Sequence, residues 1–210
     1  MSAAKPHPAK PHLSWVPNAL TIGRIAFIPV LIGAILTYGT SNAFLGATPL
    51  FALFLVLILT DFLDGYFARR WQVTSNFGRM IDPIADKLFV AGLLISFAIL
   101  TKGVWWILAP TLIIIGRDIF VSGLREHVAL EGIVMAPTQL AKWKTATEMA
   151  AIAVLLVWLL AGQWLPISDS IGQLVNGTRT LGLILLWIAA SLSAYTGFHY
   201  ARSGLGGNKA

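Results

Sequence analysis

The chain of 210 residues is strongly apolar: 57% of its residues are hydrophobic, 11% are charged, and its formal net charge is +6. A typical soluble domain has roughly 25% charged residues, so this composition, with a mean hydropathy of +0.76, excludes an ordinary soluble globule and indicates an integral membrane protein. The absence of cysteine excludes a disulfide framework, a thiolate metal site and a cysteine nucleophile.

The first fifteen residues contain two lysines and three prolines, and an apolar run follows them. This arrangement resembles the charged start of a signal peptide. However, the run from Val16 to Tyr38 is longer than a signal-peptide core of about 7–15 residues. We therefore expect residues 1–15 to form a cytoplasmic tail in front of a retained first membrane span.

Six stretches approach the roughly 20 apolar residues that a membrane helix needs. The expected spans are residues 17–39, 46–68, 82–101, 104–126, 143–162 and 179–201. These runs are long and do not alternate polar with apolar residues, which disfavours strands. The sequence thus predicts an all-α bundle of six transmembrane helices, forming one domain over residues 16–202 and followed by a cytoplasmic tail of residues 203–210.

The lysines and arginines predict the orientation of this bundle, because cytoplasmic connections carry an excess of them. With the N-terminus inside, only Lys102 and Arg179 fall in outside connections. Eight of the nine acids also map to the cytoplasmic half, Asp169 being the exception. Both termini are therefore expected in the cytoplasm, with the charged residues gathered on that side.

Four aspartates dominate the segment between the second and third spans. Asp61 and Asp64 are spaced i,i+3, and Asp82 and Asp86 are spaced i,i+4, so each pair shares one helical face. Carboxylates brought together in this way repel one another, and partial burial adds to the cost. Bound Mg²⁺ or Mn²⁺ would relieve both effects, since these ions favour carboxylate oxygens.

Simpler interpretations exist for the individual residues. Asp82 followed by Pro83 is typical of a helix N-cap with proline at the first helical position. Gly65 and Gly78 are compatible with helix packing, and Arg69 with a positively charged cytoplasmic connection. These alternatives explain the residues one at a time but not their joint spacing.

The joint spacing resembles the signature of the CDP-alcohol phosphotransferase family. It reads Asp61-x-x-Asp64-Gly65-x-x-Ala68-Arg69, then eight residues, then Gly78-x-x-x-Asp82-x-x-x-Asp86. Eight positions are fixed at set gaps, so a chance match is improbable. Members of this family are six-helix membrane enzymes, and the resemblance covers about residues 16–202.

The resemblance implies transfer of a substituted phosphate from a CDP-linked donor to a hydroxyl, with release of CMP. The implied metal ligands are Asp61, Asp64, Asp82 and Asp86, which would hold two Mg²⁺ or Mn²⁺ ions. Asp86 would also be the general base. The implied CDP-binding residues are Asn18, Thr21, Arg24, Asp61, Gly65, Ala68, Arg69 and Gly78; for Asn18, Thr21 and Arg24 the alternative is a helix start with an interfacial arginine.

The second half of the chain carries the cations that bear on the acceptor. Arg117 lies about three turns before the end of the fourth span, and an ionisable residue at that depth is a functional candidate. Lys142 and Lys144 open the fifth span, where membrane-surface anchoring is an equally simple role. Arg125 has the alternative of a structural ion pair with Glu126.

This second half resembles the branch of the family that makes phosphatidylglycerophosphate, in which Gly-Lys-x-Lys-Thr recurs. Here Ala141 replaces the usual glycine, and Thr138 stands where serine is common. The resemblance implies CDP-diacylglycerol as donor and glycerol 3-phosphate as acceptor. The residues expected around the acceptor phosphate are Arg117, Arg125, Thr138, Lys142 and Lys144.

The expected protein is a multi-pass enzyme of a bacterial inner membrane, with its site facing the cytoplasm, membrane lipids around it and no nucleic-acid partner. Family members are often homodimers, which the many small and aromatic residues permit. Two alternatives remain: the same chemistry on serine or inositol phosphate, and a cation or proton transporter whose intramembrane carboxylates relay ions.

Overall fold

The computed structural model describes residues 15–38, 52, 54, 56, 76–130, 132, 138–164 and 169–205. Its long helices are α1 (Trp15–Tyr38), α3 (Asn76–Leu100), α4 (Trp105–Leu130), α5 (Gln139–Trp164) and α6 (Asp169–Leu205). The part of the chain described here contains helices and short turns but no strand, which confirms the predicted all-α class. The predicted second span lies outside the described residues, except for three helical positions at 52, 54 and 56.

Four of the described helices are long and apolar enough to cross a membrane: Met80–Leu100, Trp105–Leu130, Gln139–Gly162 and Asp169–Gly204. The apolar part of α1, Ile22–Thr37, is shorter. Large apolar side chains such as Ile119 and Phe198 point outward, with 67% and 70% of their surface exposed. Such an outer surface suits lipid, and the chain has the character of a multi-pass membrane protein.

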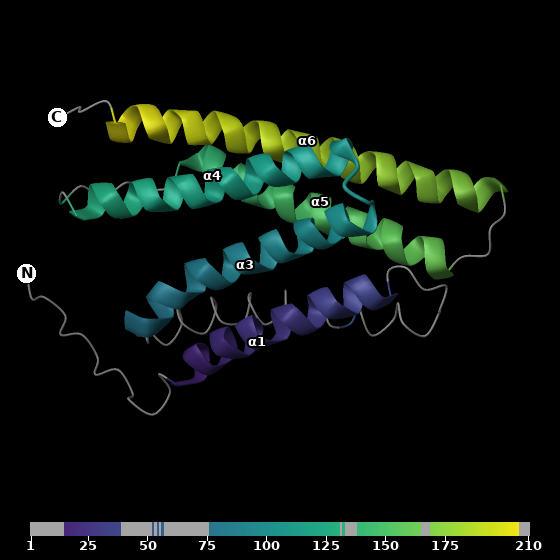
Figure 1. Cartoon of the computed structure of the whole chain (residues 1–210), viewed down its shortest axis with the longest axis horizontal. Helices are drawn as coiled ribbons and strands as arrows, with labels where there is room; N and C mark the ends of the chain where they lie inside the picture. The colour runs from purple at the N-terminus through teal and green to yellow at the C-terminus, as the bar shows by residue number, and fades with distance from the viewer. Residues whose placement is uncertain are drawn as a thin grey trace, which may run out of the picture.

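The helices form a bundle in which α3 packs against α1 and α4, and α6 packs against both α4 and α5 (Figure 1). In Figure 1, α1, α3 and α5 begin at the left-hand end, where α4 and α6 end. The first described helix therefore starts at the same end of the bundle at which the last helix finishes. We call this end the polar end.

The core consists of apolar side chains that all five long helices contribute. Ile35, Leu94, Ile114, Ile152 and Leu186 are fully buried in it. Because lipid is as apolar as these side chains, close packing holds the helices together more than exclusion from water does. Gly92 shows how close this packing is, since a Cβ atom added there would lie 2.5 Å from Cδ1 of Ile32 on α1.

Two helix starts differ from the sequence prediction. Helix α3 begins at Asn76, so the interpretation of Asp82 and Pro83 as N-cap and first helical residue is wrong: both lie inside the helix. Proline is tolerated inside membrane helices because neighbouring groups can satisfy the freed carbonyl. Helix α6 begins at Asp169, ten residues before the expected span, and its acidic first turn complements the positive end of the helix dipole.

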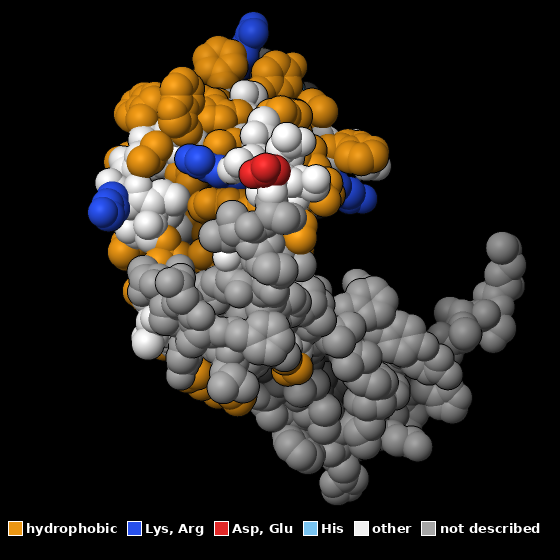
Figure 2. All heavy atoms as spheres, turned by 90° about the vertical axis from the view of Figure 1, so that its right-hand side faces the viewer, with side chains coloured by type: hydrophobic (Ala, Val, Ile, Leu, Met, Phe, Trp, Pro, Cys, Tyr) orange, Lys and Arg blue, Asp and Glu red, His pale blue; other side chains and the backbone are white. Residues whose placement is uncertain are grey.

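The charges of the described residues are distributed unevenly along the bundle. Five acids lie in the first half of α3, the second half of α4 and the first half of α5, all toward the polar end: Asp82, Asp86, Asp118, Glu126 and Glu148. The opposite end faces the viewer in Figure 2, and its described side chains are mainly hydrophobic with a few charged groups. Polar chemistry is thus concentrated at one end.

Candidate active site

A cavity of about 310 Å³ lies between α3, α4 and α5, in the part of the bundle toward the polar end. Seven of its twelve lining residues are ionisable: Asp86, Asp118, Glu148, Lys87, Arg117, Arg125 and Lys144. Ionisable side chains are costly within membrane helices and are found there mainly where they pair or serve a function. The cavity is therefore the principal candidate site in the part of the chain that the structure describes.

On the α3 side, Asp86 forms an ion pair with Arg24 of α1. Nη1 of Arg24 donates to Oδ1 of Asp86 at 3.0 Å. The arginine side chain is only 4% exposed, whereas that of the aspartate is 61% exposed. The buried cation thus orients a carboxylate that a substrate can still reach.

On the opposite side, four charged residues form a buried network. Nζ of Lys144 lies 2.8 Å from both carboxylate oxygens of Asp118 and 2.9 Å from Oε2 of Glu148, its i+4 neighbour on α5. Arg117 donates to Oδ1 of Asp118 at 2.9 Å and to the hydroxyl of Thr196 at 3.1 Å. Two cations and two anions therefore balance within this network. The burial of Lys144, at 3% exposure, excludes the membrane-surface anchor considered for it.

Helix α6 supports the two arginines. Gly197 leaves room for Arg117, because a Cβ atom there would lie 2.9 Å from Cγ of the arginine. Arg125 donates to the hydroxyl of Tyr200 at 2.9 Å and lies over its ring, 4.9 Å from the centroid. Arg125 therefore contacts this tyrosine rather than forming the ion pair with Glu126 that the sequence left open.

A second, adjacent cavity of about 570 Å³ shares Arg117, Arg125 and Thr145 with the first. Lys142 lines this second cavity, and its side chain is exposed. Thr138 lies at the start of α5, where its hydroxyl accepts a hydrogen bond from the backbone N–H of Ala141 at 3.2 Å. Thr138 thus acts as the N-cap of α5, and its own N–H donates to the Tyr200 hydroxyl at 3.1 Å.

The structure brings together one part of the predicted site. Asp86, Arg117, Arg125 and Lys144 line a single cavity. Five predicted residues lie outside the described residues: Asp61, Asp64, Gly65, Ala68 and Arg69. Asn18 and Thr21 lie on α1 and Gly78 lies on α3, but the structure does not describe the surroundings of these three residues.

The described donors fit a divalent cation in their chemistry. Asp82 and Asp86 are both exposed and lie one turn apart on α3, and their oxygens are ligands that Mg²⁺ and Mn²⁺ favour. Among the described residues, no group of three or more acidic, histidine or cysteine side chains is placed to hold a metal ion. The other two predicted ligands, Asp61 and Asp64, lie in the segment that is not described.

Sequence reasoning assigned no role to several residues that shape this cavity. Glu148 completes the buried network, Ser122 contacts Lys87, and Tyr200 contacts Arg125. The i,i+4 spacing of Lys144 and Glu148 was a usable signal, since such pairs meet on one helical face. The other two contacts join different helices, so no local spacing predicts them.

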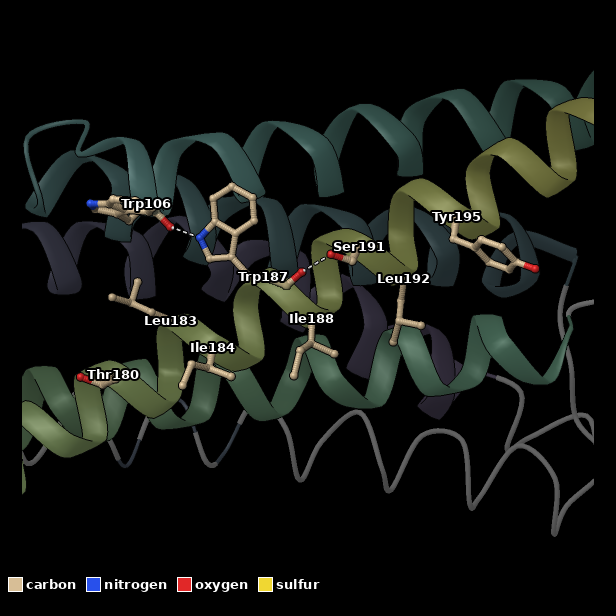
Figure 3. Close-up of a pocket in the computed structure, with 9 residues that line it drawn as sticks. All are labelled: Trp106, Thr180, Leu183, Ile184, Trp187, Ile188, Ser191, Leu192 and Tyr195. Atoms are coloured by element: carbon tan, nitrogen blue, oxygen red, sulfur yellow. Dashed lines mark hydrogen bonds between the residues drawn. The ribbon is translucent and has the colours of Figure 1, made fainter.

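A third cavity, of about 730 Å³, is different in character. It runs along α6, beside the start of α4, and its lining includes Trp106, Ile184 and Trp187 but no charged residue. Figure 3 shows the indole N–H of Trp187 pointing toward the backbone carbonyl oxygen of Trp106, to which it donates at 3.1 Å. Its lining has the hydroxyls of Thr180, Ser191 and Tyr195 but no carboxylate and no cation, so the polar cavity is the stronger candidate site.

The chain is similar to known proteins over most of its length. The CDP-alcohol phosphatidyltransferase family model matches residues 14–195. A protein of Cereibacter sphaeroides named CDP-diacylglycerol–glycerol-3-phosphate 3-phosphatidyltransferase is 36% identical, over 92% of this chain and 97% of its own. A protein of the same name from Rickettsia bellii is 39% identical, over 90% of this chain and 94% of its own.

A protein from Oryza sativa subsp. japonica is named cardiolipin synthase (CMP-forming). It is 36% identical over 94% of this chain, which spans only 59% of the rice protein. The relatives thus have two different names within one family, and both names describe enzymes. The match over residues 14–195, together with these identities, shows that the chain belongs to the CDP-alcohol phosphatidyltransferase family of enzymes.

Proposed function

We propose that the protein transfers the phosphatidyl group of CDP-diacylglycerol to glycerol 3-phosphate, giving phosphatidylglycerophosphate and CMP. One observation carries the proposal: a single cavity holds an accessible carboxylate, Asp86, together with the cations Arg117 and Arg125. A phosphorylated alcohol needs both features, a base for its hydroxyl and cations for its phosphate. The names of the bacterial relatives support the same pair of substrates.

Asp86 is the proposed general base. An alcohol is a weak nucleophile at neutral pH, and a carboxylate within hydrogen-bond reach can take its proton in the transition state. The acceptor oxygen then forms a bond to the phosphorus of the phosphatidyl group, the bond from phosphorus to the CMP oxygen breaks, and the proton passes to the carboxylate. Arg24 keeps Asp86 in position through the 3.0 Å ion pair.

The donor is proposed to lie toward α1 and the start of α3. Asp61, Asp64 and Asp82, with Asp86, would hold two Mg²⁺ or Mn²⁺ ions, which supply charge neutralisation at the diphosphate when bound. Asn18, Thr21, Arg24, Gly65, Ala68, Arg69 and Gly78 would line the CDP site. The acyl chains can remain in lipid while the head group reaches the cavity.

The acceptor is proposed to lie toward α4 and α5. The two adjacent cavities are lined by Arg117, Arg125 and Lys142, whose side chains can bind its phosphate. Each arginine offers a planar pair of N–H donors for two phosphate oxygens. Lys144 is proposed to act indirectly: its ion pair with Asp118 holds that carboxylate, which in turn pairs with Arg117 and keeps it in position. Thr138 is proposed to act as the N-cap of α5, the helix that carries Lys142 and Lys144.

The polar end is proposed to face the cytoplasm of a bacterial inner membrane. The excess of lysine and arginine in the predicted inside connections supports this orientation. Glycerol 3-phosphate would then enter from water, and CDP-diacylglycerol would enter laterally from the inner leaflet. Both termini would lie on the cytoplasmic side.

The rice relative favours one second candidate, an enzyme that forms cardiolipin with a lipid alcohol such as phosphatidylglycerol as acceptor. The cluster of cations favours glycerol 3-phosphate, because a phosphate monoester carries more negative charge than the phosphodiester of phosphatidylglycerol. The test is CMP release by purified enzyme from CDP-diacylglycerol and Mg²⁺ or Mn²⁺, with glycerol 3-phosphate, phosphatidylglycerol, serine or inositol phosphate. We expect glycerol 3-phosphate to give the highest kcat/KM; no CMP release with it would refute the proposal.

A further inference from the structure

The four cations of the polar cavity fall into two classes. Lys144 and Arg117 contact carboxylates, which offset their charges. Lys87 and Arg125, by contrast, contact the neutral hydroxyls of Ser122 and Tyr200. Among the described residues, therefore, two cations at this cavity have hydrogen-bond partners but no counter-charge.

Lys87 and Arg125 are brought to the same face of α4. Ser122 and Arg125 are spaced i,i+3, so they are neighbours on the helix surface. Nζ of Lys87 donates to Oγ of Ser122, and that hydroxyl donates in turn to the backbone carbonyl oxygen of Asp118 at 2.6 Å. The serine lone pairs are thereby left to accept from the lysine, which lines the same cavity as Arg125.

Two cations that line one partly buried cavity repel each other, and they are stabilised when an anion lies between them. An ammonium group has three N–H donors, and Ser122 occupies one. The other donors of Lys87 are not used by any hydrogen bond between described side chains. The arrangement is therefore suited to an oxyanion that bridges Lys87 and Arg125.

We infer that Lys87 is a binding residue for the acceptor phosphate, acting together with Arg125. This inference rests on the proposed function and adds a residue from α3 to a pocket otherwise built from α4 and α5. Successive residues of a helix point about 100° apart, so neighbouring positions on α3 can serve different substrates. Asp86 contacts Arg24 on α1, whereas Lys87 contacts Ser122 on α4. The base thus lies between the donor side and the phosphate of the acceptor.

The test is the steady-state kinetics of Lys87→Met, a substitution that keeps a long unbranched side chain and removes its charge. KM for glycerol 3-phosphate is expected to rise roughly tenfold or more, as for the loss of a hydrogen bond to a charged group, while KM for CDP-diacylglycerol changes less than about twofold. Lys87→Arg should restore most of the acceptor affinity. Lys102→Met is the matched control, because Lys102 is an exposed lysine in the turn after α3, at the far end from the cavity.

Ser122→Ala provides a second, milder variant in case Lys87→Met does not fold. It removes the hydroxyl that holds Lys87 and should raise KM for glycerol 3-phosphate severalfold without changing the donor KM. An unchanged acceptor KM in folded Lys87→Met, or in Ser122→Ala if the former does not fold, would overturn the inference. So would a rise confined to the donor KM. If the wild type does not use glycerol 3-phosphate at all, the proposed function itself fails, and this is established before any variant is made.

Discussion

The two sides of the polar cavity hold their charges in different ways. On the α3 side, Asp86 pairs with Arg24 and has a side chain that is 61% exposed. On the α5 side, Lys144 and Glu148 are 3% and 2% exposed and lock each other in place. The difference suits two tasks: a base must reach its substrate, whereas cations that bind a phosphate must be fixed in advance.

The buried side also carries the greater structural risk. Removing one partner of a buried ion pair leaves the other charge without compensation, which typically costs about 3–5 kcal/mol. Asp86 is exposed, and an asparagine there would still offer an oxygen to the buried Arg24, so this substitution should disturb the fold less. Substitutions on the two sides should therefore separate catalysis from stability.

The largest expected effect is on the exposed side. Asp86→Asn keeps the shape of the side chain and an oxygen for Arg24 but removes the proton acceptor. We expect kcat for CMP release to fall by about 10²–10⁴-fold, the usual contribution of general acid–base catalysis, with the Tm close to that of the wild type. Asp169→Asn, at the opposite end of the bundle, is the control. Normal turnover by Asp86→Asn would refute the assignment of the base.

On the buried side, Glu148→Ala should destabilise the fold by about 3–5 kcal/mol, because Lys144 loses one of its two carboxylate partners. Thermal unfolding in detergent measures the effect as a lower Tm. Glu126→Ala removes an exposed acid of α4 and serves as the control. Equal Tm values for the two variants would show that the network does not stabilise the protein.

A smaller effect is expected on the KM for glycerol 3-phosphate when Arg125 or Arg117 is replaced. Arg125→Ala should raise KM for glycerol 3-phosphate by about tenfold to a hundredfold. Arg117→Ala should also raise it, but less, because Asp118 already offsets part of the charge of Arg117. Acceptor titrations at saturating donor measure both values. An unchanged acceptor KM in Arg117→Ala would place that residue outside the phosphate pocket.

The smallest effect is expected where Gly197 of α6 packs against the side chain of Arg117. Gly197→Ala would place a Cβ atom 2.9 Å from Cγ of Arg117, which forces that side chain away from its preferred rotamer at about 0.5–1.5 kcal/mol. We expect KM for glycerol 3-phosphate to rise about twofold to tenfold. Gly177→Ala, in open space on the same helix, is the matched control. If Gly197→Ala and Gly177→Ala had the same KM for glycerol 3-phosphate, Gly197 would not be needed to position Arg117.

The helical class could be predicted from the sequence because long apolar runs are a local signal. The helix starts were less predictable. Asp82 and Pro83 together resemble a helix start, yet α3 begins six residues earlier and passes through both. The first ten residues of α6 are too polar for an apolar-run criterion, although they continue the helix.

Candidate site residues could be selected from the sequence where they follow a spaced motif or place a charge at membrane depth. The aspartate signature selected Asp86, and charge at membrane depth selected Arg117. The pairing of Lys87 with Ser122, and of Arg125 with Tyr200, depends on how α3, α4 and α6 pack. Tertiary packing of that kind decides which cations are already balanced and which can take a ligand.

Transfer of radiolabelled glycerol 3-phosphate into lipid tests the central claim most directly. Purified wild-type enzyme with CDP-diacylglycerol and Mg²⁺ or Mn²⁺ should convert the label to phosphatidylglycerophosphate, with one CMP released for each labelled lipid formed. CMP release with phosphatidylglycerol as acceptor, and no label in lipid from glycerol 3-phosphate, would contradict the account.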